Sequence, residues 1–170
     1  MKRMMVILFM LAAAFCLPKA QAQMLFLENT LMGKPAPEFV LDKTSGEKQS
    51  LTDFRQGKNT IVFFWATWCP HCREELIVMN KRMEELTQKG IKIAAVDLGE
   101  KPQIVKSFVQ KNNVKLEVFV DEKSSLEEPY GLIGVPTLFF LDQDGIVKAV
   151  KHSLPADVEK FFKTNSVPTQ

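Results

Sequence analysis

Cysteine and histidine are scarce in this chain. Its 170 residues include three cysteines and two histidines. A protein held together by disulfides would usually carry more cysteines at wider spacing, and a structural zinc site needs four ligands, for which a second Cys/His pair is missing. The scarcity argues against a disulfide scaffold and against structural zinc. It favours a chemical role for any close pair of cysteines.

A long hydrophobic run is also lacking, except near the first residue. Residues 4–17 are apolar without an acidic side chain, follow Lys2 and Arg3, and precede Ala20-Gln21-Ala22, which fits the small-x-small rule for signal peptidase. The stretch is short for a membrane span, which needs roughly 20 residues. We expect residues 1–22 to be a cleaved signal peptide, with retention as an uncleaved N-terminal membrane anchor as the alternative.

Neither sign of charge dominates the chain. It carries 22 Lys and Arg against 20 Asp and Glu, and loss of residues 1–22 removes three basic residues and no acidic one, which leaves 19 against 20. This balance favours neither a nucleic acid nor a strongly anionic partner. The remaining 148 residues contain no repeat, low-complexity tract or linker, and they are enough for one domain with a sizeable core.

Cys69 and Cys72 are the cysteines that remain after such cleavage. They lie between an apolar run at 61–65 and a helical pattern at 73–89. The N–H groups at a helix N-terminus favour a thiolate, which is the reactive form of cysteine. A structural disulfide here would close a tiny loop and stabilise little. Haem attachment would need a histidine where Arg73 stands. The pattern therefore predicts a reversible dithiol/disulfide couple.

The hydrophobic pattern predicts strands that alternate with helices. The expected strands are 38–42, 47–51, 60–66, 91–98, 114–120, 137–141 and 146–150. The expected helices are 73–89, 102–112 and 156–163, with single turns at 52–56 and 124–130. This order is typical of an α/β fold in which a central mixed sheet is flanked by helices on both faces.

Several motifs resemble one known family. The segment Trp65-Ala66-Thr67-Trp68-Cys69-Pro70-His71-Cys72 resembles the thioredoxin-fold active site. The lead-in GKPAPEF at 33–39, the segment YGLIGVPT at 130–137 and the turn Asp142-x-Asp144-Gly145 resemble the TlpA/ResA/CcmG-like branch of exported thiol–disulfide oxidoreductases. The resemblance implies one thioredoxin-like domain over residues 33–163, with an N-terminal β-hairpin extension. It also implies a cis Val135–Pro136 bond facing the cysteines.

The resemblance also implies roles for single residues. Cys69 would be the attacking thiolate, and Cys72 would resolve the mixed disulfide. Pro136 would shape the groove at the dithiol. The expected substrate-binding residues are Trp68, Val135 and Thr137, of which Val135 would offer backbone hydrogen bonds to a peptide.

Two residues beside the dithiol are open to more than one interpretation. Glu75 lies where members of the branch that act in cytochrome c maturation carry a glutamate, so it would handle protons or be an ordinary surface residue. Pro70-His71 is the dipeptide of the strongly oxidising DsbA type. A histidine beside Cys69 would stabilise the thiolate and make the disulfide more oxidising. This dipeptide favours an oxidant, whereas the scaffold favours a reductant.

The sequence thus predicts an exported thiol–disulfide oxidoreductase of the periplasm or cell envelope, with no bound cofactor or metal. We expect a monomer that reduces disulfides of exported proteins, with apocytochrome c as a candidate substrate and a membrane redox partner as the source of electrons. A DsbA-like thiol oxidase or isomerase and a Cu(I)-binding module are the alternatives, because soft thiolates suit Cu(I). A peroxiredoxin is disfavoured, since its Pro-x-x-x-Thr-x-x-Cys site would replace Val62 and Ala66.

Overall fold

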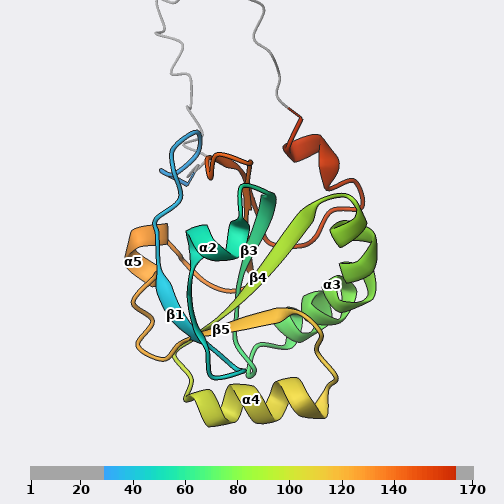
Figure 1. Cartoon of the computed structure of the whole chain (residues 1–170). Coiled ribbons are helices and arrows are strands. Elements are labelled where there is room, and N and C mark those ends of the chain that lie inside the picture. The colour runs from blue at the N-terminus through green and yellow to red at the C-terminus, as the bar shows by residue number, and fades with distance from the viewer. Residues whose placement is uncertain (1–28, 164–170) are drawn as a thin grey trace, which may run out of the picture.

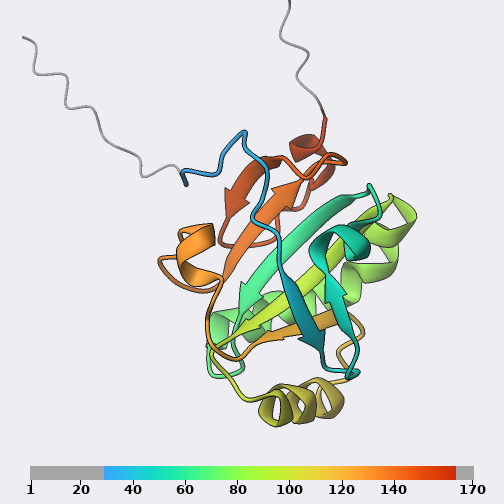
Figure 2. The same cartoon turned by 60° about the vertical axis from the view of Figure 1, so that its left-hand side comes forward.

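The computed structural model of the protein describes residues 29–163, so the signal peptide expected at residues 1–22 lies outside the described part. Seven strands form one mixed sheet in the order β2-β1-β5-β4-β3-β6-β7 (Figures 1 and 2). Their bounds are β1 Val40–Lys43, β2 Lys48–Ser50, β3 Asn59–Trp65, β4 Ile91–Leu98, β5 Glu117–Asp121, β6 Thr137–Leu141 and β7 Val147–Lys151. β3, β4 and β5 are parallel, and the other neighbours pair antiparallel.

Helices cover both faces of this sheet. One face carries α3 Pro70–Gln88, α4 Pro102–Lys111 and the 3-10 turn η1 Glu159–Phe161, and the other carries α2 Leu51–Arg55 and α5 Glu127–Tyr130 (Figure 2). The α/β architecture expected from the sequence is confirmed. None of the helices in the described part combines the length and the hydrophobicity that a membrane crossing requires.

β3 lies between β4 and β6 and is buried on both faces. Ile61, Phe63 and Trp65 pack into the core under α3 and α4, while Val62 and Phe64 pack into the core under α2 and α5. A strand covered on both faces reads as a nearly continuous apolar run, because alternate residues enter different cores. The sequence could therefore locate this strand to within one residue.

Several expected elements differ from the structure. The helix expected at 73–89 begins three residues earlier, at Pro70, and the turn expected from residue 124 begins at Glu127. The strand expected from residue 114 begins at Glu117, after the segment 112–116 has turned away from α4. The α-helix expected at 156–163 is wrong, because this segment contains only the 3-10 turn η1. The aromatic rings of Phe161 and Phe162 lie 4.9 and 5.9 Å from the ring of Phe140, centroid to centroid. The segment has no side-chain cap, and a helix of this length would not be stable alone. Packing of the two neighbouring rings against Phe140 therefore favours a tight turn.

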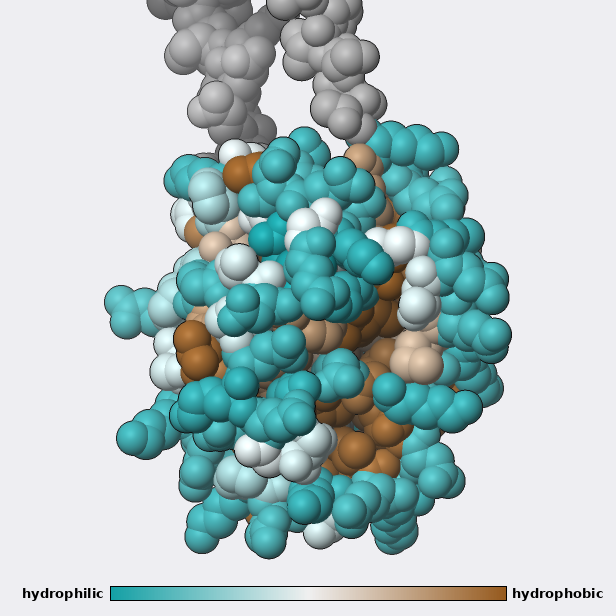
Figure 3. Space-filling view, in the orientation of Figure 1, coloured by the Kyte–Doolittle hydropathy of each residue, from teal (hydrophilic) through white to brown (hydrophobic). Residues whose placement is uncertain are grey.

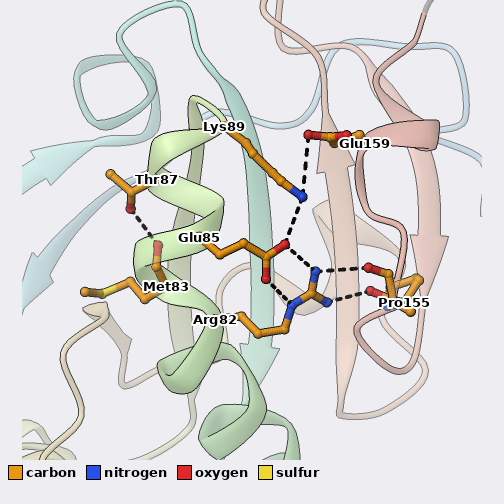
Figure 4. A network of polar contacts seen from close by, with 8 residues as sticks. Arg82, Met83, Glu85, Thr87, Lys89, Pro155 and Glu159 are labelled. Atoms are coloured by element: carbon orange, nitrogen blue, oxygen red, sulfur yellow. Dashed lines mark hydrogen bonds and ion pairs between the residues drawn. The ribbon is translucent and has the colours of Figure 1, made fainter.

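The segment before η1 is tied to α3 by a polar network (Figure 4). The guanidinium of Arg82 donates to both carboxylate oxygens of Glu85 and to the carbonyl oxygens of Pro155 and Ala156. Lys89 donates to the same Glu85 carboxylate at 2.9 Å. The hydrogen bonds from Arg82 and then from Lys89 lower the pKa of Glu85 to about 2. This carboxylate therefore stays ionised, and the network holds residues 155 and 156 against the helix.

The surface of the domain is largely polar on the side drawn in Figure 3, apart from an apolar hollow beside α3. Met83, Ile93 and Leu116 help to line this cavity, which measures about 220 Å³. Lys92 and Lys115 lie at its rim.

Tyr130 joins the lead-in segment to the core. Its ring is fully buried and meets Phe64 and Phe139 edge to face, at 4.7 and 5.0 Å between centroids. Its hydroxyl donates to the carbonyl oxygen of Pro37 at 2.6 Å. The apolar ring and the polar tip thus have separate partners, as is usual for buried tyrosine.

The substitution Tyr130→Phe should lower the free energy of unfolding by about 1–2 kcal/mol, because the Pro37 carbonyl loses its donor while the ring packing remains. Urea denaturation measures the change. The control is Ser107→Ala, which removes an exposed hydroxyl bonded within α4 and should cost less than about 0.5 kcal/mol. Equal losses in the two variants would contradict this role for Tyr130.

Candidate active site

The dithiol lies where β3 turns into α3. The N–H of Cys69 donates to the carbonyl oxygen of Ala66 at 3.2 Å, which closes a turn over residues 66–69. Cys69 is then the N-cap of α3, and its Sγ accepts the backbone N–H of Cys72 at 3.2 Å. Pro70 occupies the first turn, where its missing N–H costs no hydrogen bond. The end of a buried strand and a capped helix together fix the position of Cys69.

Cys69 and Cys72 form a disulfide, and their two sulfurs differ in access. Cys69 is 6 % exposed and Cys72 is fully buried. Thiol–disulfide exchange needs an attacking sulfur in line with the disulfide, so a partner can reach Cys69 and not Cys72. A helix N-terminus and the Cys72 N–H would both stabilise a thiolate at Cys69. The geometry suits a slightly accessible attacking cysteine followed by a fully buried resolving cysteine.

The Val135–Pro136 peptide bond faces Cys69 and is cis, as the sequence resemblance implies. The Sγ of Cys69 lies 3.8 Å from the carbonyl oxygen of Val135. Thr137 is buried at the start of β6, and its hydroxyl donates to the carbonyl oxygen of Gly134 at 2.7 Å. The structure therefore places Thr137 behind the loop that faces the dithiol, where it fixes the conformation of that loop.

Two hollows flank the segment 133–135 beside the dithiol. The first measures about 420 Å³ and is lined by this segment, Pro136, His152 and the α3 residues His71, Glu74 and Glu75. The second measures about 380 Å³ and lies between the segment, Trp68, Glu127 and the loop after β4. Trp68 and Ile133 are 67 % and 89 % exposed. Large apolar side chains so exposed are typical of surfaces that bind another polypeptide.

His71 is exposed on the first turn of α3. Its Nδ1 lies 3.4 Å from Oε2 of Glu74, one turn along the helix. The expected effect of His71 on a Cys69 thiolate stays a prediction, because the contact that the structure gives this ring is with Glu74.

Glu75 is half-buried and borders the first hollow. Its Oε2 accepts the backbone N–H of Leu154 at 2.8 Å. This bond joins α3 to the segment after β7, as Arg82 does farther along the helix. A role in holding the wall of the hollow thus stands beside the expected role in proton handling.

His152, which no sequence motif singles out, borders the dithiol loop. Its Nδ1 lies 2.9 Å from the carbonyl oxygen of Pro136, so this nitrogen carries the proton and donates. The β6–β7 pairing of Leu138 with Lys151 brings His152 opposite residue 137. A register shift between Phe140 and Leu141 sets this pairing, so counting outward from the predicted turn would not have found the contact.

Asp97 and Glu100 were also not predicted from the sequence. The carboxylate of Glu100 accepts both the N–H and the hydroxyl of Thr67, each at 2.6 Å, inside the turn that leads to Cys69. Asp97 is fully buried at the end of β4, and burial, followed by its contact with Glu100, raises its pKa to about 8. A carboxylate within the apolar run 91–98 was the available signal. Across residues 29–163, no group of three or more potential ligands is placed to hold a metal ion.

Comparison with known proteins gives a consistent result. The model of the AhpC/TSA family matches residues 32–150. The chain is 35% identical over 138 residues to thiol-disulfide oxidoreductase ResA of Bacillus thuringiensis subsp. konkukian, which covers 80% of this chain and 79% of that protein. Identity to ResA of Bacillus subtilis is 32% over 124 residues, with 72% and 69% covered.

Solved structures give the same result. A crystal structure of a thiol:disulfide interchange protein DsbE from Chlorobium tepidum, described there as putative, is similar with a TM-score of 0.69 and 30% identity over 76% of this chain and 94% of that one. The structure of StoA from Bacillus subtilis is similar with a TM-score of 0.61 and 28% identity, and it covers 75% of this chain and 95% of that one.

The unequal access of the two sulfurs predicts unequal alkylation. After reduction, brief treatment with iodoacetamide at neutral pH should modify Cys69 at least about tenfold faster than Cys72, because only Cys69 is accessible and stabilised as a thiolate. Mass spectrometry of the peptides measures the ratio. The variant Cys72→Ser should keep the fast labelling of Cys69. Equal rates at the two cysteines would contradict the assignment of Cys69 as the attacking residue.

Proposed function

The chain belongs to the AhpC/TSA family and is a thiol–disulfide oxidoreductase related to ResA, and from this premise we propose that it reduces disulfides of exported proteins. One observation carries the proposal. The accessible sulfur of Cys69 caps α3 and faces the cis Val135–Pro136 loop, while Cys72 lies buried behind it. This arrangement gives one sulfur access to a partner and keeps the other for the second step.

The proposed reaction has two exchange steps. The Cys69 thiolate attacks one sulfur of the substrate disulfide, so that a Cys69–substrate disulfide forms and one substrate thiolate leaves. Cys72, once deprotonated, then attacks Sγ of Cys69 and releases the second substrate thiolate. Two electrons pass to the substrate, and the Cys69–Cys72 disulfide remains. A dithiol donor must reduce this disulfide before the next turnover.

The proposed substrate is an extended polypeptide beside the 133–136 segment. Val135 would offer backbone hydrogen bonds, Pro136 would shape the groove, and Trp68 would cover the bound chain from the other side. Ile133 supports this role, because it is exposed at the border of both hollows. Thr137 would act indirectly, through its hydrogen bond to Gly134.

Export is part of the proposal and depends on residues 1–22. A domain at residues 33–163 that follows a signal peptide or an uncleaved anchor would work in the periplasm or cell envelope, as a monomer. Cytosolic reductants do not reach it there, so a membrane redox partner would supply its electrons. Disulfides of apocytochrome c are a candidate substrate through the resemblance to the cytochrome-c-maturation branch.

A thiol oxidase is the second candidate, and Pro70-His71 is the observation that favours it. A cationic or hydrogen-bonding His71 near Cys69 would stabilise the thiolate and hence the reduced protein. The disulfide form would then be the stronger oxidant. The direction of electron flow follows from the reduction potential of the couple.

Equilibration of the protein with glutathione or dithiothreitol buffers measures this potential. A reductase should give a value near or below about −270 mV, as in thioredoxin, whereas a DsbA-type oxidase would lie near about −120 mV. The fraction of oxidised protein is read by alkylation of free thiols. A value close to the DsbA type would overturn the proposed direction and leave the oxidoreductase class intact.

Two substitutions separate the interpretations of Glu75. If Glu75 holds Leu154, Glu75→Gln should retain activity within about twofold because its amide oxygen still accepts the N–H. Glu75→Ala should raise KM roughly fivefold, the equivalent of about 1 kcal/mol. Glu84→Ala, on the exposed side of α3, is the control. An equal fall of kcat in the Gln and Ala variants would instead favour proton handling, and reduction of a fluorescent disulfide peptide gives both constants.

A further inference from the structure

Asp97 lies on the same face of the sheet as the dithiol. In β4, Ile91, Ile93 and Ala95 pack into the core that contains Cys69 and Cys72. The residues between and after them, Ala94, Val96 and Leu98, pack into the core on the other face of the sheet. Because successive side chains of a strand point to opposite faces, Asp97 belongs to the face of the cysteines. It pairs in register with Trp65, the last residue of β3 before the dithiol turn.

The carboxyl group of Asp97 is buried with very little hydrogen bonding. The residue is fully buried, and in the described part of the chain neither carboxylate oxygen makes a hydrogen bond of normal geometry. The backbone N–H of Glu100 acts to lower the pKa of this carboxyl, but burial raises it more. A buried ionised carboxylate that is so poorly hydrogen-bonded is very costly, and such a group takes up a proton instead. Asp97 is therefore a neutral acid in need of an acceptor.

Glu100 provides that acceptor. Its two oxygens accept the N–H and the hydroxyl of Thr67, and each oxygen keeps a lone pair that can accept a further hydrogen bond. The Asp97 carboxyl lies alongside it. Asp121, at the end of the neighbouring strand β5, adds a further negative charge, and its own oxygens accept from the Ser125 N–H and hydroxyl and from the Leu126 N–H. A proton on Asp97 removes one of the three negative charges in this group of carboxylates.

We propose that Asp97 is a positioning residue for the dithiol, whose protonated carboxyl donates to Glu100 and so keeps Glu100 bonded to Thr67 in the turn that presents Cys69. Thr67 is the second residue of the turn 66–69, and Trp68 and Cys69 follow directly. Loss of the proton places the fully buried carboxylate of Asp97 beside the half-buried carboxylate of Glu100, both negatively charged. Their repulsion and their need for water weaken the Glu100–Thr67 contact and free the turn.

The proton makes this contact depend on pH in a defined direction. Burial and then Glu100 raise the Asp97 pKa to about 8, whereas an aspartate released to water titrates near its ordinary value of about 3.9. Opening of the turn therefore releases a proton at any pH between these values. The closed turn loses stability as the pH rises through this window, by up to about tenfold per pH unit, and the loss levels off above about pH 8.

Protection of the Thr67 amide against hydrogen exchange, measured by NMR and corrected for intrinsic exchange rates, tests the proposal. Protection in the natural protein should fall between pH 5 and about pH 8 and then level off. In Asp97→Asn it should stay high and flat, because the amide donates to Glu100 at every pH. Glu122→Gln, an exposed acid after β5, should behave like the natural protein. The Lys115 amide, which donates to Asn80 Oδ1, is the internal reference.

Carbon-13 titration of the Asp97 carboxyl in the natural protein keeps the test independent of the variant. A midpoint near 8 supports the proposal, and a midpoint in the ordinary range of aspartate overturns it. The same pH profile at Thr67 in the natural protein and in Asp97→Asn would also overturn it. The proposal that this turn positions Cys69 for exchange rests on the proposed function. The two measurements, amide exchange at Thr67 and titration of Asp97, do not depend on disulfide reduction. A failed reductase assay would leave the result at Thr67 unaffected.

Discussion

The burial of β3 on both faces is the constraint on which the rest of the structure depends. The strand cannot shift without moving apolar side chains out of two cores at once, so its carboxyl end is fixed in space. That end carries the turn 66–69, and the turn carries Cys69 as the cap of α3. Hydrophobic packing on both faces of the sheet thus fixes the position of one reactive sulfur. The loop of Val135 and Pro136 lies opposite this sulfur and forms the facing wall of the site.

The parts of the fold and of the site that depend on a single stretch of sequence could be predicted. β4 and β6 have the expected bounds, since each is a largely apolar run that ends at a turn. Cys69, Cys72 and Pro136 could be singled out because their motifs are contiguous. The closing helix was misjudged, because Phe161 and Phe162 pack against Phe140 on a distant strand. Helical periodicity within eight residues carries no information about such a contact.

The neighbours of the dithiol were harder to predict for the same reason. His152 meets Pro136 across a hairpin, Glu75 meets Leu154 across 79 positions, and Glu100 meets Thr67 across 33. Each contact joins residues from different elements, so no spacing in one segment reveals it. What each of these side chains does in the structure is visible only from the backbone group to which it is hydrogen-bonded. The absence of a peroxidatic site could be predicted, because Val62 and Ala66 stand where its motif would need Pro and Thr.

The attachment of residues 154–156 to α3 has a consequence for how a partner protein can enter the site. Glu75 and Arg82 bind this segment at two levels of the helix that also carries the nucleophile. The wall of the groove on this side is therefore held to the helix that carries Cys69. The distance between this wall and Cys69 is fixed. If a polypeptide binds here as proposed, Trp68 and Ile133 would be the side chains that adjust to it, because both are largely exposed. In the proposed complex, the site would thus combine a wall that is fixed to the helix of the nucleophile with exposed apolar side chains that are free to move.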